Sequence, residues 1–276
     1  MLIPGVRAHD YGTDTPENLF SRISGDGWQT IQLAFAKAIK GVQLPNIPRE
    51  VIEETKTALK ENNLTVGVLG AYIEPSLSDE TQRIYETSVF CSQIPLAAAL
   101  NAGCIGTETT NMEKQPSGTT REQALRNLRV SLETMLQKAE ECGVDIAIEP
   151  VYNHALSTPE AVRELIRDMA SKHLKVIFDP VNLLAPDLVS KQQDLYERAF
   201  DCFGDRIAAV HMKGVQCRGT EMLPCSYAAS ILDYTAIFEK LNRISGNIPL
   251  LREEADPKEA AVDLSFFRRM MDAENW

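Results

Sequence analysis

The sequence has no long hydrophobic run and comparatively few basic residues. Nowhere in its 276 residues is there a run of the roughly 18 uncharged apolar residues that a membrane-spanning helix needs. Lysine and arginine number 28 against 39 aspartates and glutamates, for a formal net charge of -11. Because nucleic acids and anionic membranes are bound largely through clustered basic side chains, we expect neither as a partner, which leaves small polar substrates.

Export signals and paired cysteines are lacking too. The opening stretch MLIPGVRAHDYG has no basic segment followed by a long apolar one, so the sequence predicts a cytoplasmic protein. No C-x-x-C pair occurs, which favours reduced structural thiols over a disulfide framework or a zinc site. The scattered cysteines are Cys91, Cys104, Cys142, Cys202, Cys217 and Cys225.

Three glycine-containing motifs are missing as well. No G-x-G-x-x-G follows the first apolar run and no G-x-x-x-x-G-K-[ST] occurs, which weakens a dinucleotide or P-loop fold with an open, doubly wound sheet. No G-x-S-x-G occurs, which weakens a serine hydrolase.

What is present is a regular alternation of short apolar runs with longer helical segments. Eight such runs over this length favour a single (β/α)8 barrel domain spanning residues 1–276, since barrels of this kind have about 250 residues. The expected strands are Leu2–Val6, Thr30–Ala34, Thr65–Leu69, Cys104–Glu108, Asp145–Glu149, Lys175–Asp179, Ile207–His211 and Pro249–Glu253. An open doubly wound sheet is the alternative.

Capping signals support two of the intervening helices. Thr119 or Thr120 can cap a helix that ends before Gly143, since threonine hydroxyls accept from first-turn amides and glycine tolerates the left-handed C-terminal turn. The second helix begins at Ser157 or Thr158.

Four expected strands end on a charged or titratable residue. These are Glu149, Asp179, His211 and Glu253, and in a barrel the carboxyl ends of all strands meet at one mouth. Three carboxylates crowded there repel one another unless they are protonated or bridged by a cation. The set therefore predicts one divalent metal ion, Mn²⁺ or Mg²⁺ by its mostly oxygen ligands, with Co²⁺ or Zn²⁺ as alternatives.

The four strand ends read DIAIEPV, VIFDPVN, AAVHMKG and PLLREEA, and in this order they resemble the sugar phosphate isomerase/epimerase family. These xylose isomerase-like TIM barrels include ketose 3-epimerases, hydroxypyruvate isomerases and inosose dehydratases. The resemblance implies that Glu149, Asp179, His211 and Glu253 bind one divalent metal, and that the two glutamates are the proton-transfer pair. Glu254 competes with Glu253, and because adjacent strand residues face opposite ways we expect Glu253 to point inward.

Two positions depart from the family pattern. Many members carry a histidine three residues after the aspartate, where this chain has Asn182. Ketose 3-epimerases tend to have an arginine six residues beyond the metal-binding histidine, where this chain has Cys217, followed by Arg218.

A metal between two carboxylates suits proton abstraction next to a carbonyl. We therefore expect an isomerase or epimerase acting on a small carbohydrate, phosphorylated or not, that works through a metal-stabilised enediolate. A metal-dependent dehydratase of the inosose dehydratase type is the alternative, and a noncatalytic sugar-binding barrel is the second one. The chain is expected to be a monomer or a homo-oligomer.

Other residues near the strand ends are candidates for binding the substrate: Asn182, Lys213, Glu108, His9 and His154. Two loop-like segments that follow strands, 113–120 and 215–226, are candidates for a lid over the mouth.

Overall fold

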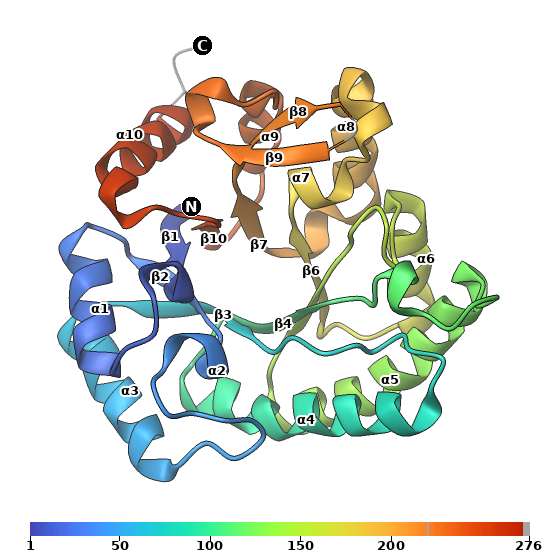
Figure 1. Cartoon of the computed structure of the whole chain (residues 1–276), viewed down its shortest axis with the longest axis horizontal. Coiled ribbons are helices and arrows are strands. Elements are labelled where there is room, and N and C mark those ends of the chain that lie inside the picture. Colours follow the sequence, from blue (N-terminus) through green and yellow to red (C-terminus); the bar gives the residue numbers. More distant parts are fainter. Residues whose placement is uncertain (220, 273–276) are drawn as a thin grey trace.

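The computed structural model describes residues 1–219 and 221–272, and across them eight parallel strands close into a barrel ringed by helices (Figure 1). The strand order around the barrel is β1-β10-β7-β6-β5-β4-β3-β2. The (β/α)8 fold class is therefore confirmed, and the open sheet is excluded. The barrel strands are β1 (Leu2–Arg7), β2 (Thr30–Leu33), β3 (Thr65–Gly70), β4 (Cys104–Glu108), β5 (Ile146–Glu149), β6 (Leu174–Phe178), β7 (Ile207–Met212) and β10 (Ile248–Arg252).

The eight expected strands match these, with boundaries shifted by a residue at most at either end. Two shifts affect the site, because Asp179 and Glu253 each lie one residue beyond their strand instead of ending it. Asp179 leaves the strand because it caps the short helix that follows. Glu253 still extends the sheet through its amide, which donates to the carbonyl of Met212 at 3.0 Å.

Most of the longer helices are amphipathic and bury one apolar face. The helices are α1 (Pro16–Gly25), α2 (Phe35–Ala38), α3 (Arg49–Glu61), α4 (Glu80–Ala99), α5 (Arg121–Cys142), α6 (Pro159–Met169), α7 (Pro180–Leu183), α8 (Gln192–Phe203), α9 (Tyr234–Leu241) and α10 (Ala260–Met271). Among the described residues, no helix combines the length and apolar character needed to cross a bilayer.

For each of the two predicted helix starts the sequence offered two capping residues, and the structure shows which one caps. Thr120, not Thr119, begins α5, and its hydroxyl and the side chain of Gln123 form a reciprocal capping box. Gly143 ends that helix with φ +66°, in the left-handed region where glycine is favoured. Thr158 begins α6 by accepting from the amide of Ala161 at 3.2 Å.

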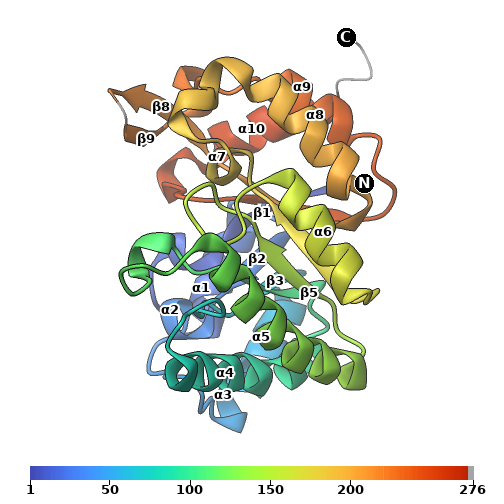
Figure 2. The same ribbon diagram turned by 90° about the vertical axis from the view of Figure 1, so that its right-hand side faces the viewer.

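The segment 215–226, expected to be a loop, is largely an antiparallel hairpin. β8 (Gly214–Arg218) pairs with β9 (Glu221–Cys225), and in Figure 2 the hairpin projects at the left, on the same side as α2. Pro224 argues against a strand in the sequence, because proline has no N–H to donate to a neighbouring strand. It is tolerated here because β9 is an edge strand. Segment 113–120 carries only the end of a 3-10 turn, Met112–Lys114.

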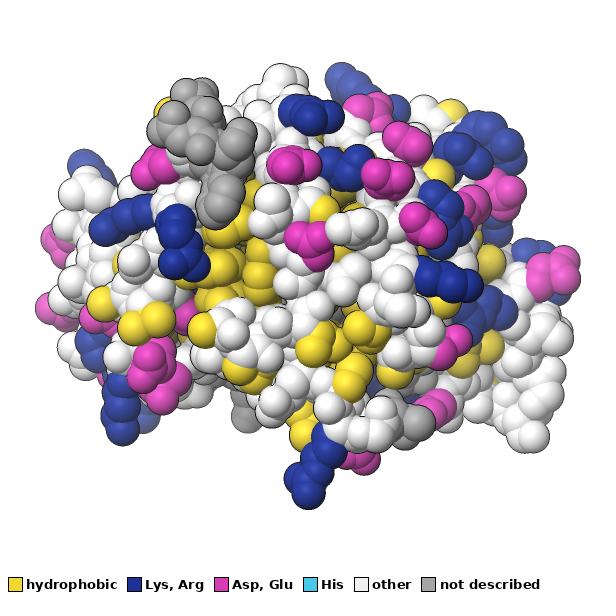
Figure 3. Space-filling view, turned by 90° about the horizontal axis from the view of Figure 1, so that it is seen from above, with side chains coloured by type: hydrophobic (Ala, Val, Ile, Leu, Met, Phe, Trp, Pro, Cys, Tyr) yellow, Lys and Arg dark blue, Asp and Glu magenta, His cyan; other side chains and the backbone are white. Residues whose placement is uncertain are grey.

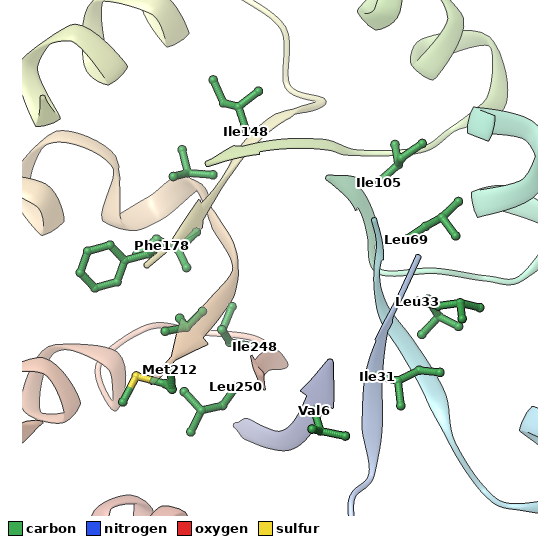
Figure 4. Packing of buried hydrophobic residues seen from close by; sticks show 14 of the residues in the cluster. Val6, Ile31, Leu33, Leu69, Ile105, Ile148, Phe178, Met212, Ile248 and Leu250 are labelled. Carbon is green, nitrogen blue, oxygen red and sulfur yellow. The ribbon is translucent and has the colours of Figure 1, made fainter. Parts of the chain in front are cut away.

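Two apolar layers hold the barrel. Side chains such as Leu69, Ile148 and Phe178 point away from the barrel axis toward the helices (Figure 4). A second cluster belongs to the opposite set of strand positions: Val68, Cys104, Ala147, Ile177, Ala209 and Leu251. Each fully buried large aliphatic side chain contributes about 1.5–3 kcal/mol to folding. The interior is thus packed with apolar side chains, and the strand ends are left for polar ones.

Candidate active site

A cavity of about 610 Å³ opens at the carboxyl ends of the barrel strands. It is a predominantly polar hollow, and its lining includes Arg7, Lys37, Tyr72, Glu108, His154 and Glu253. Strand-end residues from widely separated parts of the chain meet here because closure of the barrel brings β1 beside β10. We refer to this hollow as the mouth cavity.

Three of the predicted metal ligands gather at this end of the barrel. Glu149, Asp179 and His211 each offer a ligand atom, the three atoms lie within 4.8 Å of one another, and all three side chains are buried. They come from adjacent strands, since β5 pairs with β6 and β6 with β7. This cluster could hold a metal ion.

Asp179 is oriented by the backbone of α7. Its Oδ1 accepts hydrogen bonds from the amides of Val181 at 2.7 Å and Asn182 at 2.9 Å, which caps the helix. Oδ2 remains free of these amides and lies 2.8 Å from Nζ of Lys213. Burial, opposed by Lys213, raises the pKa of Asp179 to about 6.

Asn182 orients Glu149. Its Nδ2 donates to Oε1 of Glu149 at 2.5 Å, and the other carboxylate oxygen lies 3.1 Å from Nδ1 of His211. The asparagine also lines the mouth cavity, so it stands between the cavity and the carboxylate. A residue expected to contact substrate thus contacts a predicted ligand as well.

His211 is the group that best tests whether a cation fits. Its Nδ1 lies 3.1 Å from Glu149 and 3.3 Å from Oε1 of Glu253, yet within the described chain neither ring nitrogen has a partner with hydrogen-bond geometry. Burial alone lowers the pKa of His211, but Glu253 and Glu149 outweigh it and raise the pKa to about 9. An imidazole nitrogen facing carboxylate oxygens in a buried site is a donor set that a divalent cation fits.

Glu253 and Glu254 both line the mouth cavity but differ in burial. Glu253 is buried, whereas Glu254 is exposed and adopts φ +55° at the start of the next loop. The carboxylate of Glu253 lies 2.9 Å from Nζ of Lys213 through Oε2 and 3.5 Å from Arg7 through Oε1. Burial opposes its ionisation, but His211 and Lys213 prevail and hold the pKa of Glu253 well below its usual range. Its role as fourth ligand stays a prediction.

Of the remaining substrate-binding candidates, Glu108 and His154 line the mouth cavity and His9 does not. Glu108 pairs in register with Glu149 across β4 and β5, and burial together with that neighbour raises the pKa of Glu108 to about 8. His154 lines the cavity 3.8 Å from Glu108, and burial lowers its pKa. His9 is not among the residues that line the cavity. Burial, and secondarily the positive charge of Arg7, lowers the pKa of His9 to about 4.

Sequence reasoning missed the polar residues on the opposite side of the cavity. Gln32 donates to the hydroxyl of Tyr72 at 2.7 Å, and Nζ of Lys37 lies 3.8 Å from the centre of the Tyr72 ring. Arg7, Lys37 and Tyr72 all line the mouth cavity. The one signal in the sequence was Gln32, a long polar side chain between Ile31 and Leu33 in β2.

A larger surface hollow, of about 850 Å³, lies between β9 and α10. Its lining is largely apolar, and the one buried charged pair there is already matched, since Nε of Arg252 donates to Asp263 at 2.8 Å. Figure 3 views the molecule from the side that carries α10 and shows hydrophobic side chains among both acidic and basic ones. Because the strand-end titratable groups converge elsewhere, we place the candidate active site at the mouth cavity.

Comparisons with known proteins agree with the barrel fold. A family model described as a xylose isomerase-like TIM barrel matches residues 20–270. A 3-keto-D-glucoside 4-epimerase from E. coli is 19% identical with a TM-score of 0.73, and the match covers 98% of this chain and 100% of that one. A D-psicose 3-epimerase from Clostridium cellulolyticum H10, solved with D-tagatose, is 16% identical with a TM-score of 0.73 and coverage of 98% and 99%.

A third solved structure was determined in complex with a metal ion. A xylose isomerase-like TIM barrel protein from Mycobacterium smegmatis in complex with magnesium is 16% identical, with a TM-score of 0.69 and coverage of 98% and 94%. At these identities the three likenesses demonstrate a shared fold. None of the curated proteins compared with the chain matches it.

Proposed function

We propose that this chain, which belongs to the family of xylose isomerase-like TIM barrels, is a divalent-metal-dependent sugar isomerase or epimerase. The observation that carries the proposal is the buried cluster of Glu149, Asp179 and His211, with the carboxylate of Glu253 3.3 Å from the histidine. Such a set is expensive to bury without a cation. It lies beside a polar cavity of about 610 Å³ that is lined by Asn182, Lys213 and Glu253 among others and is large enough for a monosaccharide.

The residues have distinct tasks in this proposal. Glu149, Asp179 and His211 would hold the ion together with Glu253, and a divalent ion held there would supply polarisation of the carbonyl and hydroxyl oxygens of the substrate. One of the two glutamates removes the proton from the carbon next to the carbonyl. Return of a proton to the opposite face of that carbon gives an epimer, and return to the neighbouring carbon gives an aldose-ketose isomer.

Three further residues position substrate and base. Nδ2 of Asn182 donates to Glu149 at 2.5 Å, so one of the two carboxylates proposed to transfer protons has a fixed orientation. Glu108 and His154 line the cavity within 3.8 Å of each other, and their polar atoms are placed to meet sugar hydroxyls. The mostly oxygen ligand set favours Mn²⁺ or Mg²⁺, with Co²⁺ or Zn²⁺ as alternatives.

The proposal is tested by measuring metal content and proton exchange together. The chain is purified without chelator, its metal is quantified, and it is incubated in D₂O with a panel of ketoses, ketose phosphates and inososes. We expect about one divalent ion per chain and deuterium at one carbon of one substrate, and we expect Glu149→Gln to abolish the exchange because the amide cannot take up a proton.

The matched control is Glu164→Gln, the same change on the exposed face of α6, which should leave exchange intact. Product analysis separates an epimer or isomer from the dehydrated product that the alternative reaction would give. A folded chain that takes up none of the four ions would overturn the proposal and favour a noncatalytic sugar-binding barrel.

A further inference from the structure

Lys213 places a positive charge among the groups proposed to hold the metal. Its side chain is buried, and Nζ lies 2.8 Å from Oδ2 of Asp179 and 2.9 Å from Oε2 of Glu253. These carboxylates follow different strands, β6 and β10, so the ammonium group spans the barrel end between them. Two of the four predicted ligands therefore already share a cation.

The backbone holds Lys213 in this position. His211 and Lys213 are two residues apart, so strand alternation sends both side chains inward while Met212 packs outward into the core. The hydroxyl of Tyr234 donates to the carbonyl of Lys213 at 3.1 Å. The next residue, Gly214, starts the hairpin so close to β9 that a Cβ there would lie 2.4 Å from the carbonyl oxygen of Cys225. The lysine has little backbone freedom to withdraw.

The charge balance of the site changes with this residue. Glu149, Asp179 and Glu253 carry three negative charges when ionised, and the ammonium group of Lys213 reduces the sum to minus two. The two positive charges of a divalent ion would neutralise this net charge of minus two. The ion also has to share Asp179 and Glu253 with a cation that lies within hydrogen-bond distance of both.

We propose that Lys213 is a resident counter-ion that holds the carboxylates of Asp179 and Glu253 in place before a divalent metal binds and then competes with the metal for them. Lys213 is thus a positioning residue for the site, in addition to any contact with substrate. The inference rests on the proposed function only in taking the ligand of this site to be a divalent ion.

The test compares Mn²⁺ affinity across a charge series by isothermal titration calorimetry at pH 8. Removal of one positive charge a few ångströms from the ion should make Lys213→Met bind Mn²⁺ about tenfold tighter than the wild type or more. Lys213→Arg keeps the charge and should not gain affinity. Lys37→Met is the matched control, because Lys37 lines the same cavity but lies over the Tyr72 ring instead of between carboxylates.

Thermal unfolding gives an independent readout. Without metal, Lys213→Met should melt at a lower temperature than the wild type, because it removes the ammonium group that lies 2.8 and 2.9 Å from two buried carboxylates. Mn²⁺ should then raise its melting temperature by more than it raises that of the wild type. If Lys213→Met does not fold, Lys213→Gln removes the same charge and carries the same expectations.

The outcomes separate this inference from the proposed function. Equal or weaker Mn²⁺ binding by the neutral variants, or no Mn²⁺ binding by any variant, would overturn the role of Lys213. Tighter binding by the neutral variants supports it, even where the wild type exchanges no deuterium into any sugar. Deuterium exchange by the wild type, without a gain in Mn²⁺ affinity for the neutral variants, would contradict the role of Lys213 and leave the proposed function standing.

Discussion

The two sides of the barrel mouth differ in the kind of polar contact that their side chains make. On the side of β5, β6, β7 and β10, Glu149, Asp179 and His211 are buried and ionisable, and they lie within a few ångströms of one another. On the side of β2 and β3, Gln32 and Tyr72 meet through a neutral hydrogen bond of 2.7 Å. The first side brings ionisable groups together at one point, and the second presents donors, acceptors and an aromatic face beside the cations Arg7 and Lys37, which suits a small polar ligand.

The difference shows how one barrel end can separate two tasks. Ion binding needs charges that converge on one point, and adjacent parallel strands provide this because their ends lie side by side. A small polar substrate would be bound by hydrogen bonds spread over a larger surface, and long side chains on the other strands could provide them. Variants on the two sides should therefore affect different measurements.

The largest effect is expected from Asp179→Asn. The amide oxygen can still accept from the amides of Val181 and Asn182, so the cap of α7 is retained while the charge is lost. Because even changes to groups behind the ligands cost 10–100-fold in metal affinity, loss of a ligand charge should lower Mn²⁺ affinity by about 100-fold or more. Calorimetry measures it, and unchanged affinity would remove Asp179 from the ligand set.

The next effect is the pH dependence of metal binding. The pKa of His211 is raised from its ordinary value near 6.5 to about 9, so below about pH 9 an ion has to displace a proton from the ring. Mn²⁺ affinity should then fall about tenfold for each pH unit below 9, and more steeply below about 6, where Asp179 also takes up a proton. The same raised pKa stabilises the metal-free fold below pH 6.5, and this stabilisation is lost as the pH rises through 9.

Calorimetric titrations from pH 6 to pH 9 in buffers of different ionisation enthalpy count the released protons directly. Circular dichroism over the same range is the control that the fold persists. An affinity that does not change between pH 7 and pH 9 would contradict the assignment of the raised pKa to a metal ligand.

The smallest effect is expected from Tyr72→Phe on the opposite side. The change removes the Tyr72 hydroxyl, which accepts from Gln32. Tyr72 lines the cavity, and loss of one hydrogen bond to substrate, worth about 0.5–1.5 kcal/mol, should make substrate bind about two- to tenfold more weakly. Mn²⁺ affinity should not change. Tyr85→Phe, the same substitution on an exposed part of α4, is the matched control.

A drop in Mn²⁺ affinity for Tyr72→Phe as large as that for Asp179→Asn would show that the two sides act as one unit. The comparison would be sharpened if substrate KM moved with Tyr72 alone while metal content moved with Asp179 alone.

Much of the fold could be predicted because its signals are local. Threonine caps such as Thr120 and Thr158 and the strand-to-helix alternation depend on residues a few positions apart. The convergence of Glu149, Asp179 and His211 could be predicted as well, because adjacent parallel strands place their ends together. The hairpin β8–β9 could not, since Pro224 reads as a loop residue until an edge strand accommodates it.

The part of the site that escaped prediction depends on contacts between distant residues. Lys213 was expected to meet substrate, and the structure places its ammonium group between Asp179 and Glu253. Tyr72 and Lys37 gave no signal, because a tyrosine after a strand and a lysine in a short helix are ordinary at the surface of any barrel.

The sequence by itself determined the barrel, its strand ends and the types of side chain that those ends present, because propensity, capping and hydrophobic period act over a few residues. Only the tertiary structure decided which charges share partners. Barrel closure sets β10 between β1 and β7, and so brings Glu253 within 3.5 Å of Arg7 and 2.9 Å of Lys213. Electrostatic pairing depends on distances across space that no local pattern records.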